Sequence, residues 1–232
     1  MRALISAGAS VTLCVRDRAA AERVAAEAGG RTQVVTADVT DQQAVQDAVA
    51  TAVATFGPVD VLVNNAGTVE TVPFLKSTPE HFTRMYAVHV LGPMFTTKAV
   101  LPSMLERGHG RVVNVASIAG LHGAPYVAHY VAAKHALVGL TRSLAMEFGP
   151  KGIAFNAVCP GYVDTDMVTN SVQRVAARTK HSEADTLAAI LADAGQPRLV
   201  RPKEVADAVL AFALPGAAKR EAETLVLMGH DS

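Results

Sequence analysis

The sequence predicts an α/β fold built on a doubly wound parallel sheet. Short apolar runs rich in Val alternate with longer segments of helical periodicity, and this alternation is typical of parallel strands joined by helices. The apolar runs are continuous, which indicates strands covered on both faces. Since neither a repeat nor a linker interrupts the chain, we expect one domain over residues 1–232.

In chain order, residues 2–8 read as the end of a helix that stops at Gly8. Short apolar runs predict strands at residues 11–15, 33–37, 59–63, 111–116, 154–158 and 224–228. Longer amphipathic segments predict helices at residues 19–28, 41–56, 79–107, 126–148 and 202–214. Pro93 and Pro102 either bend or divide the helix at residues 79–107. Residues 162–201 are polar and partly helical.

Composition and charge exclude several classes of function. Lys plus Arg and Asp plus Glu each total 21, so nothing favours a nucleic-acid or anionic-membrane partner. No run of 18 apolar residues and no signal-peptide core is present. Cys14 and Cys159 are interpreted as small buried residues in a reducing compartment, so we expect a cytoplasmic protein. No His, Cys or Asp cluster has metal-ligand spacing, and we expect no metal.

Three polar residues are predicted to meet near the middle of the chain. Ser117 ends the apolar run at residues 112–116. Tyr130 and Lys134 lie four residues apart in the helix predicted at residues 126–148, on one helix face with Cβ atoms about 5–6 Å apart. Open α/β sheets bind ligands beyond the carboxyl ends of their strands, so Ser117 can reach the same place.

The chemistry of these residues suggests a shared role. A free tyrosine has a pKa near 10 and is a poor base at neutral pH. A cation about 4 Å away at an effective dielectric near 20 supplies roughly 4 kcal/mol, which is enough to lower that pKa by about three units. Tyr130 beside Lys134 is thus a candidate proton donor and acceptor, with Ser117 holding a carbonyl or alcohol oxygen. Alternatively, Tyr130 and Lys134 are ordinary helix-surface residues.

Further marks along the chain favour the catalytic interpretation. Tyr130 follows Ser117 by thirteen residues, and the other marks are Asp38-Val39, Asn64-Asn65-Ala66-Gly67, Pro160-Gly161 and Thr165. Together they resemble the signature of the short-chain dehydrogenase/reductase family over essentially the whole chain. The resemblance implies a Rossmann-like fold, a nicotinamide cofactor, and hydride transfer in which Ser117, Tyr130 and Lys134 are catalytic.

The resemblance also implies cofactor contacts. Asp38 and Val39 resemble the pair that contacts adenine, and Lys134 matches the residue that binds the nicotinamide ribose beside Tyr130. The other implied contacts follow two later strands: Asn65, Ala66, Gly67, Pro160, Gly161, Val163 and Thr165.

Cofactor choice is read at the end of the strand at residues 11–15. An acidic residue there suits the ribose hydroxyls of NAD, whereas an arginine suits the 2′-phosphate of NADP. Arg16 stands at this point. We expect NADP(H), with NAD as the alternative cofactor; Arg16 as a solvated strand-end cation is the alternative for the residue.

One position departs from the family pattern. The family usually has Asn at a fourth catalytic position, where it helps to hold a water-mediated proton relay to the lysine. The matching residue here is His89. An imidazole both donates and accepts hydrogen bonds, so a modified relay is one interpretation, and a packed helix histidine is the other.

A second departure concerns the start of the chain. Family members normally begin with a strand and a glycine-rich turn that opens a helix, where the pyrophosphate binds. This sequence lacks that strand and turn, and Gly8 lies after the helix rather than before it. The first strand normally lies mid-sheet, so its neighbours either close up or stay about 10 Å apart. We expect the biological protein to have further residues upstream.

The expected function is an oxidoreductase that moves hydride between NADP(H) and a ketone or secondary alcohol. Residues 118–129 and the substrate loop at residues 162–201 would set the substrate, and apolar Leu121, Ala124 and Val127 resemble reductases of 3-oxoacyl thioesters. The alternative is an inactive, truncated subunit that acts with a partner. Family members pair their long helices across two-fold axes, so a homodimer or homotetramer is expected.

Overall fold

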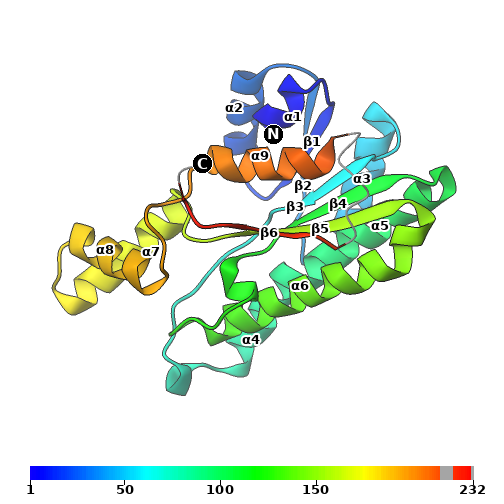
Figure 1. The fold of residues 1–232 in the computed structure, drawn as a ribbon. Helices are drawn as coiled ribbons and strands as arrows, with labels where there is room; N and C mark the ends of the chain where they lie inside the picture. Colours follow the sequence, from blue (N-terminus) through cyan, green and yellow to red (C-terminus); the bar gives the residue numbers. More distant parts are fainter. Residues whose placement is uncertain (215–221, 231–232) are drawn as a thin grey trace.

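The strands form two parallel sheets in the computed structural model, which describes residues 1–214 and 222–230 (Figure 1). Strand β1 pairs with β2, and a second sheet has the order β3-β4-β5-β6. Their bounds are β1 Val11–Val15, β2 Thr32–Thr36, β3 Val61–Asn64, β4 Gly110–Val115, β5 Ile153–Pro160 and β6 Thr224–Leu227. All these pairs run parallel. The predicted α/β fold is confirmed.

Helices cover both faces of the sheets. Their bounds are α1 Arg2–Ser6, α2 Arg18–Ala28, α3 Gln42–Phe56, α4 Pro79–Tyr86, α5 Gly92–Arg107, α6 Ala128–Phe148, α7 Asp166–Thr179, α8 Glu183–Asp193 and α9 Pro202–Ala213. Helices α1 and α9 pack together on one face, and α5 and α6 cover the other, with α3 beside α5. The α7–α8 pair projects from the carboxyl-terminal edge of the main sheet (Figure 1). No helix of the described chain is long and apolar enough to cross a membrane.

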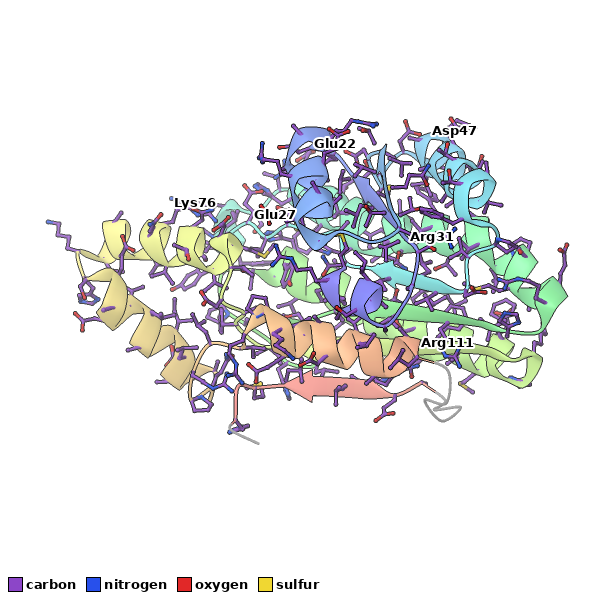
Figure 2. All side chains as sticks on the ribbon, turned by 90° about the horizontal axis from the view of Figure 1, so that it is seen from above. Glu22, Glu27, Arg31, Asp47, Lys76 and Arg111 are labelled. Atoms are coloured by element: carbon purple, nitrogen blue, oxygen red, sulfur yellow. The ribbon has the colours of Figure 1, made fainter. Side chains whose placement is uncertain are left out.

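Short polar caps set the helix starts predicted from the sequence. Asp17 accepts a hydrogen bond from the Ala20 amide at 3.0 Å and begins α2. Asp41 accepts hydrogen bonds from the Gln43 and Ala44 amides and begins α3. Such caps satisfy amides that have no partner inside the helix. Figure 2 shows charged side chains, including Glu22 on α2 and Asp47 on α3, on the outer surface at this end of the molecule.

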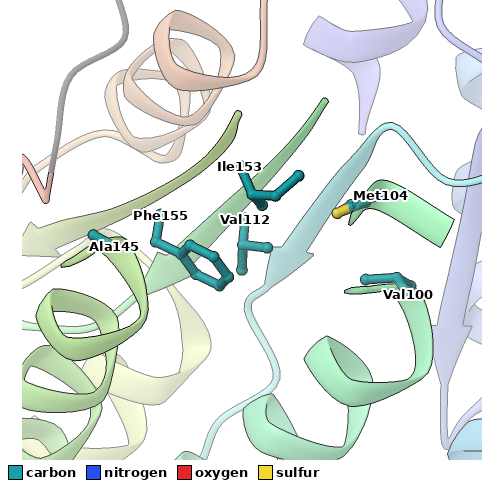
Figure 3. Packing of buried hydrophobic residues seen from close by; sticks show 6 residues of the cluster. All are labelled: Val100, Met104, Val112, Ala145, Ile153 and Phe155. Atoms are coloured by element: carbon teal, nitrogen blue, oxygen red, sulfur yellow. The ribbon is translucent and has the colours of Figure 1, made fainter. Parts of the chain in front are cut away.

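The core is densest around β4 and β5. Val112 and Phe155 are fully buried, and Met104 reaches them from α5. Figure 3 shows these side chains meeting between the sheet and the helices α5 and α6. A continuous apolar strand covered on both faces is buried along nearly its whole length, and β5 follows this rule. The carboxyl end of β4 therefore rests on a rigid base.

The two sheets are separated at the position of the expected missing strand. In the order 3-2-1-4-5-6, strand 1 lies between strands 2 and 4, which correspond here to β1 and β3. These two strands do not pair in the described chain, so they have not closed up. Residues of β1 and β3 are only partly buried, in contrast to β5.

The structure corrects several details of the prediction. Cys14 is exposed rather than buried, because β1 has a neighbouring strand on only one edge in the described chain. The segment at residues 79–107 is divided near Pro93, as one of the two expectations held, by a π-helical turn at Ala87–Leu91, whereas Pro102 lies inside α5. Helix α6 begins at Ala128, since Tyr126 has a left-handed backbone with φ of 64°.

Candidate active site

Ser117 lies just past the carboxyl end of β4 and opens a short 3₁₀ turn, Ile118–Gly120. Its hydroxyl accepts a hydrogen bond from the Ala119 amide at 3.1 Å, which orients the side chain locally. Gly120 brings this turn against α6: an added Cβ would lie 2.8 Å from the Lys134 carbonyl oxygen. A glycine is thus required for the Ser117 turn to approach the helix so closely.

Helix α6 carries Tyr130 and Lys134 on the face that meets this turn. Lys134 is 4% exposed, and its Nζ donates to the Val115 carbonyl oxygen at 2.9 Å. The same Nζ lies 5.6 Å from the centre of the Tyr130 ring. The Ser117 hydroxyl forms a hydrogen bond that favours the ionised Tyr130 phenol. The structure therefore brings Ser117, Tyr130 and Lys134 together, and the surface interpretation of Tyr130 and Lys134 does not hold.

The electrostatics of this group differ from the expectation. Burial raises the pKa of Tyr130 to about 12, and the hydrogen bond from Ser117 opposes this only in part. Burial also lowers the pKa of Lys134 to about 8. The expected lowering of the Tyr130 pKa by Lys134 is not present in this state, because burial desolvates the phenol and the Lys134 ammonium is held against the Val115 carbonyl. Tyr130 is therefore protonated at neutral pH.

His89 lies in the π-helical turn and packs against Tyr130. The His89 and Tyr130 rings meet edge to face, with centroids 5.2 Å apart. The His89 Nε2 donates to the Thr68 carbonyl oxygen at 2.7 Å, which leaves Nδ1 as an acceptor. Nδ1 is buried without a protein partner. Burial, with the Lys134 charge adding to it, lowers the pKa of His89 to about 3, so the imidazole is neutral.

The predicted adenine contacts lie at the carboxyl ends of β1 and β2. Asp38 accepts hydrogen bonds from the amide and hydroxyl of Thr40 at 2.9 and 2.8 Å, and these bonds hold the pKa of Asp38 below its usual value. The guanidinium of Arg16 lies 4.0 Å from the Asp38 carboxylate, and its side chain is 77% exposed. Val39 packs against α5, where an added Cβ at Gly92 would lie 3.1 Å from Val39 Cγ2.

The other predicted cofactor contacts follow β3 and β5. Asn65, Ala66 and Gly67 are exposed directly after β3, and Gly67 packs against the His89 ring. Pro160 ends β5, and its carbonyl oxygen accepts from the Ser117 hydroxyl at 3.5 Å. Gly161, Val163 and Thr165 follow it, with Thr165 at the start of α7.

These residues fit a nicotinamide cofactor at the reacting end. The exposed backbone after β3 and the buried Lys134 meet on the same edge of the sheet as Ser117, which is the edge where open α/β folds bind ligands. The pyrophosphate end is different. Within the described residues, no glycine-rich turn opens a helix between β1 and β3.

The sequence reasoning missed two neighbours of the Ser117, Tyr130 and Lys134 group. Cys159 is fully buried just before Pro160. Burial raises the pKa of its thiol, and the Lys134 charge opposes this rise. The Tyr162 ring is close enough to Tyr130 to raise the pKa of that phenol slightly. Position directly after β5 was the available signal for Tyr162, because side chains at carboxyl ends of parallel strands converge.

Comparison with known proteins agrees with this geometry. A model of the short chain dehydrogenase family matches residues 1–176. The chain is 47% identical over 167 residues to the inactive 2-(S)-hydroxypropyl-CoM dehydrogenase 2 of Xanthobacter autotrophicus, covering 72% of this chain and 73% of the relative. It is 38% identical over 182 residues to the acetoacetyl-CoA reductase of Rhizobium meliloti, covering 73% and 76%.

A solved structure is similar over nearly the whole chain. It is a variant of the actinorhodin polyketide ketoreductase with NADPH, at a TM-score of 0.92 and 36% sequence identity. The similarity covers 98% of this chain and 89% of the ketoreductase. The two sheets of this chain therefore keep the arrangement found in that related structure.

Proposed function

The chain belongs to the short-chain dehydrogenase family of oxidoreductases, and from this premise we propose that it reduces a ketone with NADPH, or runs the reverse reaction on a secondary alcohol. The observation that carries the proposal is the convergence of Ser117, Tyr130 and Lys134 at the carboxyl end of β4. The bound nicotinamide supplies or accepts the hydride. The protein residues then need only to hold the substrate oxygen and to donate or accept its proton.

Tyr130 is proposed as the general acid in the reductive direction. A phenol whose pKa is raised to about 12 keeps its proton at neutral pH and can donate it to an alkoxide that forms beside it. Ser117 holds the substrate oxygen in line through its hydroxyl. The Lys134 ammonium, 5.6 Å from the ring centre, balances the phenolate that remains after donation.

His89 is proposed as a support for Tyr130 with access to a relay. Its Nε2 is committed to the Thr68 carbonyl, so this edge of the ring cannot pass a proton. Its free, buried Nδ1 can accept a hydrogen bond from a water molecule. The neutral ring also avoids placing a second positive charge beside Lys134.

NADP(H) is proposed as the cofactor, with NAD as the alternative. The side chain of Arg16 is largely exposed at the carboxyl end of β1, where the 2′-phosphate of NADP would lie. The related ketoreductase structure contains NADPH. Asp38, 4.0 Å from Arg16, would then order the arginine rather than bind the ribose hydroxyls itself.

The proposed substrate is a 3-oxoacyl thioester or a similar ketone. Leu121, Ala124 and Val127 are half-buried in the segment between Ser117 and α6, so an apolar chain is favoured there over a charged one. The related acetoacetyl-CoA reductase and polyketide ketoreductase act, by their names, on such groups. Residues 162–201 are proposed as the substrate loop within a single domain of residues 1–232, in a cytoplasmic enzyme.

A homodimer or homotetramer is proposed through α4 and α6. These helices border a hollow of about 330 Å³, lined mainly by apolar side chains that include Phe82 and Leu91. Tyr86 at its rim is 48% exposed. An apolar, self-complementary face is typical of symmetric association, and light scattering of the purified chain measures the assembly directly.

The test replaces Tyr130 by Phe, which keeps the ring and removes the proton. We expect the rate of NADPH-dependent reduction of acetoacetyl-CoA to fall by about 10²–10⁴-fold, the usual loss when acid–base catalysis is removed. NADPH binding, followed by fluorescence, should persist. Tyr86→Phe is the matched control and should retain the wild-type rate. Wild-type turnover in Tyr130→Phe would remove Tyr130 as the proton donor.

A second candidate function is that of a non-catalytic subunit. The facing edges of β1 and β3, which have no partner strand within the described ranges, favour it, because the site for pyrophosphate normally forms there. The Xanthobacter relative is itself named as inactive. Absence of NADPH binding by the chain, together with an intact fold by circular dichroism, would support this second function over the first.

A further inference from the structure

We propose that Gln196 is a positioning residue, whose buried side-chain amide holds the turn at residues 160–162 in place beside the catalytic group. The inference rests on the proposed function, because it assigns Gln196 a part in the proposed reaction. Gln196 lies in the loop after α8, far from Tyr130 in the sequence. It is not in the set of residues that the family resemblance implies.

The Gln196 amide makes three hydrogen bonds to the backbone. Its Nε2 donates to the Tyr162 carbonyl at 2.8 Å and to the Arg198 carbonyl at 2.6 Å. Its Oε1 accepts from the Tyr162 amide at 2.8 Å. Gln196 is 3% exposed, so water cannot replace these bonds. The Tyr162 amide therefore relies on this side chain, while the Tyr162 carbonyl accepts from both Gln196 and the Val200 amide.

Gly161 leaves room for the Gln196 amide because it has no side chain. A Cβ added at Gly161 would lie 2.2 Å from Gln196 Oε1 and 3.0 Å from its Cδ. Any side chain at Gly161 would displace the amide or shift the turn. A glycine and a glutamine that fit in this way are expected to act as a unit.

The turn held by Gln196 reaches the catalytic group on its other side. The Gly161 amide donates to the Leu227 carbonyl at 2.8 Å, which ties the turn to β6. The Pro160 carbonyl accepts from the Ser117 hydroxyl at 3.5 Å, and Ser117 in turn acts on the Tyr130 phenol. A shift of the turn would therefore move a group that contacts Ser117.

Gln196 also stands at the base of the projecting α7–α8 pair. The two chain segments that lead into and out of this pair are joined by a parallel bridge between Val163 and Val200. The Val200 amide donates to the Tyr162 carbonyl, and the Asp164 amide donates to the Val200 carbonyl. Together with the hydrogen bonds of Gln196, these bonds join the two segments at the base of the α7–α8 pair. The turn at residues 160–162 is thus bonded to both segments at the base of the pair.

The first experiment compares Gln196→Met with wild type in two assays. Methionine keeps the length of the side chain and removes all three hydrogen bonds. We expect the kcat for NADPH-dependent ketone reduction to fall at least 10-fold, because a misplacement of about 1 Å at a reacting centre can cost 10²-fold. The KM for NADPH should change less than kcat does, because Asp38 and Arg16 are untouched and only the implied contacts at Pro160 and Gly161 move with the turn. Gln46→Met, on the exposed face of α3, is the matched control.

A second assay does not depend on turnover. Hydrogen exchange at the Tyr162 amide should become at least 10-fold faster in Gln196→Met, whereas amides in the middle of β5 should keep wild-type rates. Unchanged exchange at Tyr162 would overturn the inference. If exchange rises as expected and no variant, wild type included, reduces a ketone, the proposed function fails and the structural role of Gln196 stands.

A double-mutant cycle covers the case in which Gln196→Met does not fold. Gly161→Ala introduces the clash with the amide, and Gln196→Ala removes the amide. We expect each single variant to lower kcat, and the double variant to be no slower than Gln196→Ala alone, because no clash remains. Losses that simply multiply in the double variant would show two independent residues and would reject the positioning unit.

Discussion

The centre of the main sheet and the β1–β2 sheet are built from similar apolar strands but reach different degrees of burial. β5 is buried along nearly its whole length, and its Phe155 is fully buried between α6 and the sheet. β1 is half-buried, and Cys14 in it is exposed. The difference is the number of neighbouring strands, because among the described residues β5 pairs on both edges and β1 on one. Burial here follows from strand pairing rather than from apolar composition.

This difference coincides with a division of function. The proposed reacting groups lie at the end of the fully paired strand β4, whereas Asp38 and Arg16 lie at the end of the β1–β2 sheet. The reacting end is rigid in the chain as it stands. The end that would hold the adenine half of a dinucleotide depends on a sheet with an unpaired edge.

The largest expected effect compares the two regions by stability. Phe155→Ala should lower the free energy of unfolding by about 3–5 kcal/mol, the usual cost for a buried Phe. Leu13→Ala in half-buried β1 should cost about 1 kcal/mol, because less apolar surface is lost. Urea unfolding measures both values. Equal costs would show that the β1–β2 sheet is as well packed as the centre and would break the comparison.

A second prediction concerns whether water reaches the buried side chain of His89. The pKa of His89 is lowered to about 3, against 6.5 in an unfolded chain. Between these values the unfolded state binds a proton that the folded state rejects, so stability falls as the pH drops from 6.5 towards 3. Near pH 5, this loss is about 2 kcal/mol.

His89→Asn removes the titrating ring. When the pH falls from 7 to 5, the free energy of unfolding of this variant should therefore decrease by about 2 kcal/mol less than that of the wild type. Urea unfolding at the two pH values gives this difference, and the change in absolute stability caused by the smaller side chain cancels. His129, which is also buried with its pKa lowered, titrates in both proteins and cancels as well. An equal loss in both proteins would mean that water reaches His89.

The smallest effect concerns the unpaired edges of β1 and β3. A strand, glycine-rich turn and helix from a related reductase, fused before Met1, should raise the affinity for NADPH at least about 10-fold. The added helix terminus would bring a dipole worth typically 0.3–1 kcal/mol for an anion, and its free amides would add hydrogen bonds. Calorimetry of the chain with and without the segment measures the change. Equal micromolar affinities would show that residues 1–232 already bind the whole cofactor.

Much of this fold could be predicted from local patterns. The continuous apolar run in β5 and the Asp caps of α2 and α3 depend on neighbouring residues only, and these elements lie where the sequence placed them. The exposure of Cys14 could not be predicted in the same way, because it depends on which strand lies next to β1. The start of α6 was placed two residues early, since the left-handed backbone of Tyr126 has no sequence signal.

The candidate site shows the same limit. The spacing of Tyr130 and Lys134 in one helix predicted their shared face correctly. Their pKa values depend on burial by distant segments, so the direction of the Tyr130 shift was wrong. Gln196 was missed because its partners Tyr162 and Arg198 matter only through their backbone groups, which any sequence provides.

The π-helical turn at Ala87–Leu91 constrains how this chain can change over evolution. Such a turn is one residue wider than an α-helical turn, so the helix after it is shifted in phase relative to the helix before it. Met85 before the turn and Val100 after it are both buried, and a single deletion between them would rotate one of these faces out of the core. The segment is therefore expected to tolerate a substitution within the turn more readily than any change in its length.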